Sequence, residues 1–314
     1  MGTPLVIAHR GASGERPEHT RAAYDLAIAQ GADFIEPDLV LSRDGVLIVR
    51  HENEIGGTTD VADHPEFAGR HTTRTVDGHT VDGWFTEDFT LAELQTLRAR
   101  ERLPAVRPAN TAFDGREPVL TFQQVIDIAR EGSRRTGRPI GVCPELKHPS
   151  HFAAAGLPME DLFVAVLEAN ALTGADAPIL IQCFEVGPLR RLAARIDAPL
   201  LQLMSVAGGP VDRPDLTYAA MATPAGLAAV AGYARWIGVE TAMVAPDVGR
   251  APTSLIADAH AAGLKVAAWT FRAEPAFLPP GAADLTAWLT AFRTFGLDAA
   301  FSDFPAVAVA VAAL

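Results

Sequence analysis

The sequence predicts an α/β protein built around a (β/α)8 barrel, and three observations lead to this prediction. Short apolar runs alternate with helix-like stretches along the chain, and several of these stretches end in glycine, as at Gly31, Gly263 and Gly296. Such alternation is typical of βα units and a mostly parallel sheet. The length of 314 residues would also suit two domains, but α/β barrels often use such a length as one domain. We therefore expect a single domain over residues 1–314.

The apolar runs locate the expected strands. Only Leu41–Gly45 separate the second strand from the third, whereas a parallel crossover needs about a dozen residues. Because Ser42–Gly45 has turn chemistry, these two strands should form a hairpin. Nine candidate strands, less the one used in the hairpin, then leave eight for the barrel. The candidates are Leu5–His9, Phe34–Val40, Val46–His51, Ile140–Lys147, Ile179–Phe184, Leu200–Met204, one within Trp236–Ala245, Val266–Thr270 and Ala299–Ser302.

Residues 52–120 are interpreted as an insertion after the third strand. Periodicity weakens there, and Asp-Gly pairs punctuate a segment that is too long for an ordinary barrel loop. Within it we expect one helix, Leu91–Arg100, because Thr90–Glu93 has the spacing of a capping box. The chain should return to the barrel at Thr121, which is expected to cap a helix over Phe122–Glu131.

The composition excludes several classes of function. With 26 basic and 38 acidic residues the formal net charge is −12, which argues against nucleic-acid binding. No apolar run reaches the roughly 20 residues of a membrane span. Residues 1–10 lack the pattern of a secretory signal, which leaves the localisation open: periplasmic or secreted if a signal has been removed, and otherwise cytoplasmic. Cys143 and Cys183 lie in apolar runs and are expected to be buried thiols.

Carboxylates follow two of the expected strands. Glu36 and Asp38 are two residues apart at a strand end, so their side chains should leave the sheet on one face, where they would repel each other. A divalent cation with oxygen ligands would offset that repulsion. Glu145 would be a third ligand, and Lys147 on the same face would be a cation for an anionic substrate. The alternative is a set of surface carboxylates paired with arginines.

Two histidines follow strands at the same rim. His9 comes directly after the first strand, and His51 ends the third, where the hairpin register should place it opposite Glu36. With Arg10 and Lys147, these groups suit metal-assisted chemistry on a phosphate, in which histidines move protons. Gly11–Gly14 is interpreted as a flexible turn. The remaining histidines have no comparable context and are expected to be structural: His19, His64, His71, His79, His148, His151 and His260.

In combination these motifs resemble those of the glycerophosphodiester phosphodiesterase family. The likeness spans almost the whole chain. His9–Gly14 with Pro17–Thr20 resembles the family's opening signature, Glu36–Val40 resembles its acidic metal motif, and Ser42–Gly45 leads to His51 as in the family. Later strand motifs are similar at Pro144–Lys147, Gln182–Phe184, Trp269–Thr270 and Ser302–Pro305, while Thr58–Asp63 and the long insertion resemble the branch typified by bacterial periplasmic enzymes.

The resemblance implies a (β/α)8 barrel that hydrolyses a small-molecule glycerophosphodiester to glycerol 3-phosphate and an alcohol. It departs from the family where Glu52 replaces the usual aspartate and where Pro37 separates the two metal carboxylates. By position, it implies acid/base roles for His9 and His51, one divalent cation, Ca²⁺ or Mg²⁺, on Glu36, Asp38 and Glu145, and substrate contacts for Arg10, Lys147 and Trp269.

Two alternative functions stay open at this point. A lysophospholipase D-like enzyme could use the same site, and Trp84, Phe85 and Phe89 would then form an exposed apolar rim. A soluble head-group substrate would instead bury these three residues. Because the insertion begins directly after His51, we expect it to cover the barrel mouth, where Trp84 and Phe85 would tune substrate preference. A non-catalytic binding protein is the other alternative, although it has no use for two proton-transferring histidines.

Overall fold

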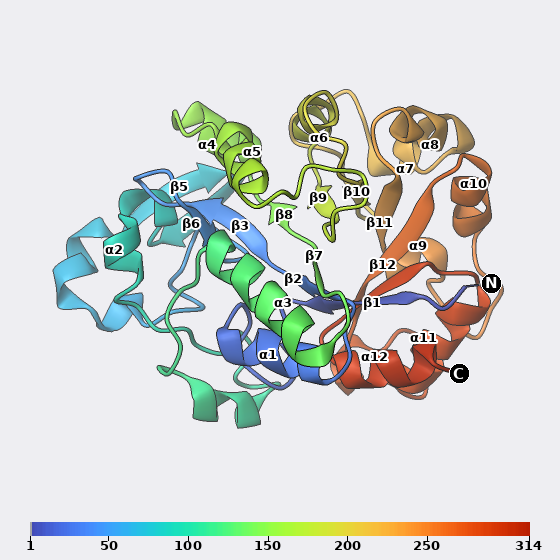
Figure 1. The fold of residues 1–314 in the computed structure, drawn as a ribbon, viewed down its shortest axis with the longest axis horizontal. Helices are drawn as coiled ribbons and strands as arrows, with labels where there is room; N and C mark the ends of the chain where they lie inside the picture. Colours follow the sequence, from blue (N-terminus) through green and yellow to red (C-terminus); the bar gives the residue numbers. More distant parts are fainter. Residues whose placement is uncertain (1) are drawn as a thin grey trace.

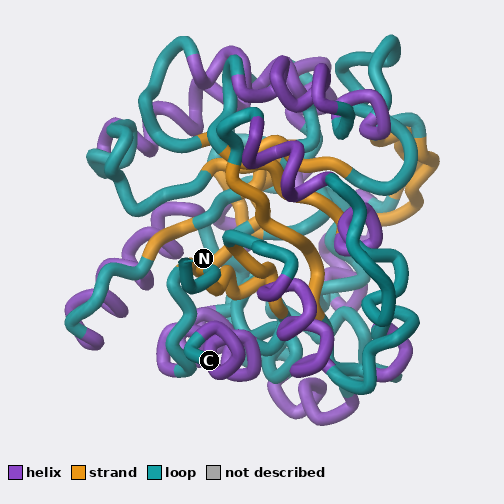
Figure 2. Tube along the Cα trace, turned by 90° about the vertical axis from the view of Figure 1, so that its right-hand side faces the viewer, coloured by secondary structure: helices purple, strands orange, loops and turns teal. Residues whose placement is uncertain are grey.

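Strands and helices alternate along the chain around one curled sheet (Figure 1). The computed structural model describes residues 2–314, with the strands inside and most helices at the periphery (Figure 2). The strands are β1 (Leu5–His9), β2 (Phe34–Glu36), β3 (Asp38–Leu41), β4 (Leu47–Val49), β5 (Thr72–Val76), β6 (His79–Gly83), β7 (Gly141–Val142), β8 (Glu145–Leu146), β9 (Ile181–Cys183), β10 (Leu200–Met204), β11 (Trp236–Glu240), β12 (Lys265–Phe271) and β13 (Ala299–Ser302).

The α-helices cover the outer face of this sheet and connect its strands. They are α1 (Arg21–Ala29), α2 (Leu91–Leu94), α3 (Phe122–Thr136), α4 (Pro149–Ala154), α5 (Met159–Ala169), α6 (Val186–Ala193), α7 (Tyr218–Met221), α8 (Pro224–Ala231), α9 (Thr241–Val244), α10 (Leu255–Ala261), α11 (Leu285–Thr294) and α12 (Pro305–Ala312). None of the helices within residues 2–314 has both the length and the apolarity that crossing a membrane requires.

Eleven strands form the sheet, in the order β4-β3-β8-β9-β10-β11-β12-β13-β1-β2-β7, and β5 and β6 form a separate hairpin. All neighbours in the large sheet are parallel except β3 and β4. The predicted α/β class with a mostly parallel sheet is therefore confirmed. Parallel strands bring their carboxyl ends to one edge, and this geometry gathers the functional side chains.

Two prolines divide strands that the sequence suggested were continuous. Pro37 separates β2 from β3, and Pro144 separates β7 from β8, because proline has no N–H to donate to a ladder. Pairing nevertheless continues past the breaks, since the Glu145 N–H donates to the Pro37 carbonyl at 2.9 Å. Asp38 consequently lies beside Glu145 in the parallel register of β3 and β8.

The predicted hairpin between β3 and β4 is confirmed, but its register differs by one residue. Leu39 pairs with Val49, so partner numbers sum to 88, whereas His51 opposite Glu36 would require a sum of 87. Gly45 adopts a φ of +76°, and this left-handed residue adds one position to the turn. The predicted placement of His51 opposite Glu36 is therefore wrong, and the register brings it opposite the following residue.

Of the two helices predicted from capping residues, the one that begins after Thr121 is present. Thr121 caps α3 through a capping box with Gln124, and α3 continues to Thr136, where Gly137 ends it with a φ of +70°. The capping box at Thr90 is also present, but α2 ends at Leu94.

The expected helix Leu91–Arg100 is thus wrong beyond its first turn. The Arg98 N–H donates to an Asp60 carboxylate oxygen at 2.7 Å, and the Ala99 N–H donates to the Glu117 carbonyl at 2.9 Å. These long-range hydrogen bonds satisfy the backbone donors that a longer helix would have used internally.

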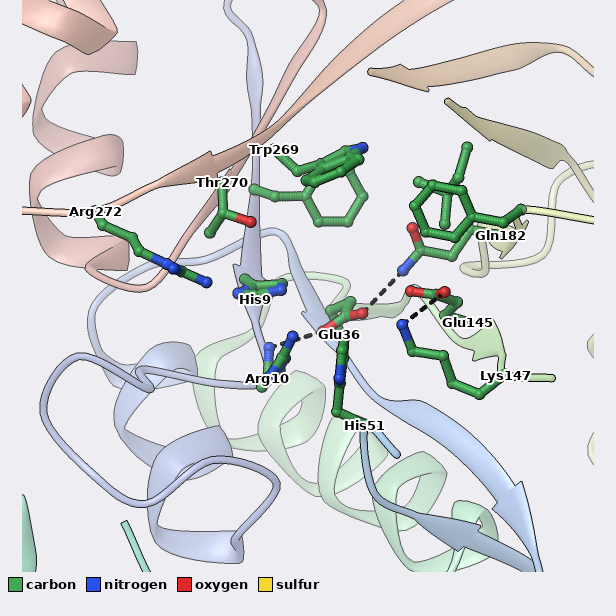
Figure 3. Close-up of a pocket in the computed structure, with 13 residues that line it drawn as sticks. His9, Arg10, Glu36, His51, Glu145, Lys147, Gln182, Trp269, Thr270 and Arg272 are labelled. Carbon is green, nitrogen blue, oxygen red and sulfur yellow. Dashed lines mark hydrogen bonds and ion pairs between the residues drawn. The ribbon is translucent and has the colours of Figure 1, made fainter. Parts of the chain in front are cut away.

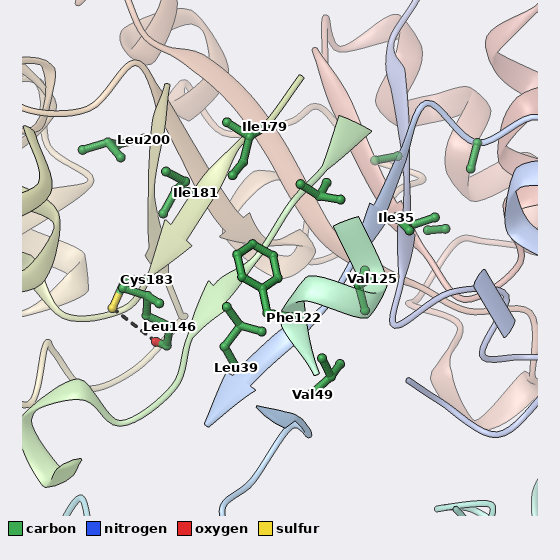
Figure 4. Packing of buried hydrophobic residues seen from close by; sticks show 14 of the residues in the cluster. Ile35, Leu39, Val49, Phe122, Val125, Leu146, Ile179, Ile181, Cys183 and Leu200 are labelled. Carbon is green, nitrogen blue, oxygen red and sulfur yellow. Dashed lines mark hydrogen bonds between the residues drawn. The ribbon is translucent and has the colours of Figure 1, made fainter. Parts of the chain in front are cut away.

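The core has two parts, because successive side chains of a strand point to opposite faces of the sheet. In β1, Val6 and Ala8 join the large cluster between sheet and helices, while Ile7 joins the cluster enclosed by the sheet. Figure 4 shows part of the large cluster, where Phe122 of α3 packs among strand residues. Cys143 and Cys183 are buried free thiols, as expected.

Candidate active site

A cavity of about 300 Å³ opens where the strands of the curled sheet end. In Figure 3, Glu36 lies in the middle of its side chains, with His9 and Arg10 on one side and Glu145 and Lys147 on the other. Seven of the eight residues that the sequence singled out therefore meet here, since His51 and Trp269 also line the cavity. The lining comprises His9, Arg10, Glu36, His51, Glu145, Lys147, Gln182, Phe184, Leu203, Trp269, Thr270, Arg272 and Phe301.

The eighth residue, Asp38, lies beneath this lining in a cluster of three buried carboxylates. One oxygen from each of Glu36, Asp38 and Glu145 lies within 4.8 Å of the other two. Burial, followed by repulsion from Asp38, raises the pKa of Glu36 well above its ordinary value. Burial also raises the pKa of Glu145 to about 8, although Lys147 opposes this shift.

A divalent cation fits this cluster. The buried Asp38 Oδ1 atom has no hydrogen-bond donor, and the Lys147 ammonium lies 3.5 Å from it. Lys147 is already 2.8 Å from Glu145 Oε1, so one ammonium is shared by Asp38 and Glu145. Hard carboxylate oxygens at this spacing are the ligands that calcium and magnesium prefer. The alternative of surface carboxylates paired with arginines is wrong, because all three groups are buried.

Neighbouring groups hold the carboxylates in place. The Arg10 N–H donates to Glu36 Oε2 at 2.8 Å, and the Gln182 side-chain amide donates to Glu36 Oε1 at 2.9 Å. His19, which the sequence gave no functional context, is fully buried and lies with Nε2 2.9 Å from Asp38 Oδ2. Hydrogen bonds of this kind fix the orientation of metal ligands.

The two histidines of the cavity have the same arrangement. His9 Nδ1 lies 2.7 Å from Asp303 Oδ1, and His51 Nδ1 is hydrogen-bonded to Glu52. A carboxylate that accepts from Nδ1–H leaves Nε2 as the nitrogen available to a substrate. We call these two pairs, His9–Asp303 and His51–Glu52, the histidine dyads.

Both rings are neutral near pH 7. Burial lowers the pKa of His9 to about 4, with Arg10 adding to the shift and Asp303 opposing it. Burial likewise lowers the pKa of His51 to about 3, with further contributions from Arg10 and Lys147. A neutral imidazole can accept a proton, and a phosphate anion beside it would favour the protonated form.

The loop after β1 is tightly packed, which corrects the interpretation of Gly11–Gly14 as a flexible turn. Arg10 and Gly11 have φ angles of +59° and +87°, and a Cβ on Gly11 would lie 2.7 Å from the backbone of Ala23. The Arg10 guanidinium donates to Glu18 at 3.0 Å and lies 3.3 Å from Asp38. The strained backbone therefore fixes a cation at the cavity.

The exposed aromatic rim that the lipid alternative required of residues 52–120 is not formed. Phe85 and Phe89 are completely buried, and half-buried Trp84 donates its indole N–H to the Phe67 carbonyl at 2.9 Å. None of these rings lines the cavity. Phe89, Trp84 and Phe85 contact Phe67, His71 and Arg74 of their own segment, which lies at the left in Figure 1. The exposed apolar rim of a lipid-type site is therefore not formed by these residues.

Several residues of the site lie in motifs that resemble those of the family, but residue spacing alone did not predict what their side chains contact. Gln182 and Asp303 stand in strand motifs that resemble those of the family, but the sequence gave no partner for either side chain. Glu18 and His19 stand in the opening signature, again without a partner. Arg102 had no signal at all, because the carboxylates that it contacts are 84 and 50 residues away.

Comparison with known proteins identifies the family. The sequence profile of the glycerophosphoryl diester phosphodiesterase family matches residues 9–307. The chain belongs to this family. A glycerophosphodiester phosphodiesterase of Arabidopsis thaliana is 36% identical over 96% of this chain and 84% of its own length. A glycerophosphodiester phosphodiesterase of Haemophilus influenzae is 31% identical over 64% of this chain and 57% of its own length. The protein is accordingly a phosphodiester hydrolase.

Solved structures agree on the fold. A glycerophosphoryl diester phosphodiesterase structure from Silicibacter pomeroyi has a TM-score of 0.71 at 23% identity, covering 99% of this chain and 94% of that one. A phosphodiesterase from Oleispira antarctica, solved in complex with the product sn-glycerol-3-phosphate, has a TM-score of 0.67 at 23% identity, covering 99% and 98%.

Proposed function

We propose that this enzyme hydrolyses glycerophosphodiesters at the cavity between the histidine dyads, releasing glycerol 3-phosphate and an alcohol. The observation that carries the proposal is the convergence of His9 and His51, each with Nδ1 bonded to a carboxylate, on a cavity that contains a buried acidic cluster. The product bound in the Oleispira antarctica relative has the chemistry that such a cavity would hold.

Glu36, Asp38 and Glu145 would hold one divalent cation, calcium or magnesium. When bound, the cation supplies Lewis acidity that withdraws charge from the phosphate and from a neighbouring hydroxyl. Arg10 and Lys147 add fixed positive charge on opposite sides of Glu36, and together they would bind the phosphate. Trp269 lies on the apolar side of the cavity and would contact the glycerol moiety.

The substrate supplies its own nucleophile. One histidine accepts the proton of the glycerol hydroxyl adjacent to the ester while that oxygen forms a bond to phosphorus. The other histidine donates a proton to the alcohol oxygen as its bond to phosphorus breaks. The product of this step is a cyclic 1,2-phosphate, which water opens with the two histidines in exchanged roles. The cavity lining contains no serine or cysteine that could act as a covalent nucleophile, and this scheme does not require one.

The test is a panel of glycerophosphodiesters with different alcohols, assayed for glycerol 3-phosphate release before and after chelation. We expect release to stop on chelation and to return with calcium or magnesium. An analogue with the adjacent hydroxyl methylated should bind but resist cleavage. Turnover of that analogue near the parent rate would instead indicate direct attack by water. Release of lysophosphatidic acid from lysophospholipids, with no cleavage of the soluble glycerophosphodiesters, would favour the lipid alternative.

We further propose that the curled sheet is one closed (β/α)8 barrel domain spanning residues 1–314, with residues 52–120 as an insertion. If β2 with β3, and β7 with β8, each count as one strand interrupted by proline, the parallel strands form a continuous ring. The supporting pairings are β13 with β1, β1 with β2, and the bridge of Val142 to Ile179 beside β9. Strand β4 then lies outside the ring and leads into the insertion.

A further inference from the structure

Two arginines of the segment between β4 and α3 lie behind the two histidine dyads. Arg102 and Arg107 are separated by a tight turn in which the N–H groups of Val106 and Arg107 both donate to the Leu103 carbonyl, at 2.9 and 2.7 Å. We call residues 102–107 the arginine turn. Its two guanidinium groups leave the turn in different directions, and each ends on a carboxylate that is bonded to a different histidine.

Arg102 connects the His51 dyad to the phosphate-binding side of the cavity. Its guanidinium donates to both oxygens of Glu52, at 3.0 and 2.7 Å, and to both oxygens of Glu18, each at 2.7 Å. Glu18 in turn accepts from Arg10 at 3.0 Å. A planar fork that holds two carboxylates through four hydrogen bonds leaves little freedom for either of them.

Arg107 has the corresponding place behind the His9 dyad. Its guanidinium donates to Asp303 Oδ2 at 2.5 Å and to the Ser13 carbonyl at 2.8 Å, and it also donates to Glu274. The other Asp303 oxygen lies 2.7 Å from His9 Nδ1. The Arg107 side chain is 7% exposed, so this contact is screened little by water.

We propose that Arg102 and Arg107 are positioning residues for proton transfer, one for each histidine dyad. This inference rests on the proposed function. Each arginine fixes the carboxylate that orients an imidazole, and so fixes the direction of its Nε2 atom. Without Arg102, Glu52 would rotate away from His51 Nδ1. Without Arg107, Asp303 would keep only its ion pair with Arg272, at 3.0 Å on the same Oδ2 atom, and would turn toward it. In either case the imidazole would lose its alignment with the oxygen it serves. One short turn thereby orders the proton donor and the proton acceptor together.

The experiment compares two substrates that differ only in the need for a general acid. Glycerophosphocholine releases an alkoxide that must be protonated, whereas the para-nitrophenyl ester of glycerol 3-phosphate releases a stable phenolate. The variants are Arg102→Gln and Arg107→Gln, each assayed for kcat and KM on both substrates. Arg100→Gln is the matched control, because Arg100 lies in the same segment and pairs with Asp63 at the surface.

We expect both variants to lose about 10- to 100-fold in kcat on glycerophosphocholine with a much smaller change in KM. On the para-nitrophenyl ester, one variant should recover most of its rate, and that variant identifies the histidine which protonates the alcohol. The other variant should stay slow, because its histidine removes the hydroxyl proton from either substrate. Arg100→Gln should behave as the unmodified enzyme does.

Equal losses on both substrates for both variants, or losses confined to KM, would overturn the proposal. Glu52→Gln separates the effects of the two carboxylates that Arg102 contacts, because it alters the His51 dyad and leaves the Glu18 contact in place. This variant should reproduce the kcat loss of Arg102→Gln. If Arg107→Gln fails to fold, Arg107→Lys keeps the buried charge without the fork geometry and carries the same test. Failure of the unmodified enzyme to cleave either substrate would refute the proposed function instead.

Discussion

Replacing His19 by alanine tests whether this buried ring orders the metal site. His19 Nε2 lies 2.9 Å from Asp38 Oδ2, and Nδ1 lies 2.8 Å from the Tyr24 hydroxyl. Burial lowers the pKa of His19, so the neutral ring donates from Nε2 to Asp38 and accepts from the Tyr24 O–H. Without this donor, Asp38 is free to turn away from Glu36 and Glu145.

The expected loss can be estimated from similar outer-shell contacts. Removing such a partner typically weakens metal binding by about 10- to 100-fold, or about 1.4 to 2.7 kcal/mol. The fully buried ring also leaves a cavity, which should cost about 2 to 4 kcal/mol of folding stability. His19→Ala should therefore show two separate losses, one in cation affinity and one in stability.

Calorimetric titration with calcium and with magnesium measures the first loss, and denaturant unfolding of the metal-free protein measures the second. Tyr24→Phe is the matched control, because it removes the hydroxyl that supports His19 Nδ1 and keeps the contact to Asp38. Its loss of cation affinity should be smaller than that of His19→Ala. A His19→Ala protein that is destabilised but binds both cations as tightly as the parent would refute the reasoning.

Three further predictions follow from the site and its surroundings. Because burial raises the pKa of Glu145 to about 8, a cation must displace a proton below that pH, so apparent affinity should fall by up to about tenfold per pH unit as pH decreases; a flat titration series contradicts this. Gly11→Ala should lose about 1 to 3 kcal/mol of stability and weaken substrate binding through Arg10, measured as Tm and KM. Phe85→Ala should lose about 3 to 5 kcal/mol of stability with unchanged alcohol preference, and a changed preference would restore the rim hypothesis.

Residues next to strand ends could be placed at the site from the sequence, because the carboxyl ends of parallel strands meet at one edge of a sheet. Because β1 and β2 are neighbouring parallel strands, His9 and Glu36 emerge at the same edge, where they are paired in register. Glu36 and Asp38 stayed on one face despite the intervening Pro37, because the period-2 geometry of strands survives a missing hydrogen-bond donor. Local rules were sufficient for these side chains.

The tertiary structure decided the features that depend on contacts between distant segments. The hairpin register changed by one residue because of a single left-handed glycine, and helix α2 stopped early because Arg98 and Ala99 found partners elsewhere in the chain. Arg102 and Arg107 carry no periodic signal, since an exposed arginine and one that fixes a buried carboxylate look alike in a sequence.

The sequence by itself determined the α/β class, the strands of the large sheet and which polar side chains meet at one cavity, because strand periodicity and turn chemistry act over a few residues. The β5–β6 hairpin was not expected. The tertiary structure alone decided which groups hold the reacting side chains in place. His19 against Asp38 and Arg107 against Asp303 are contacts between segments 19 and 196 residues apart. Their existence depends on how the whole chain packs, and no local pattern records that packing.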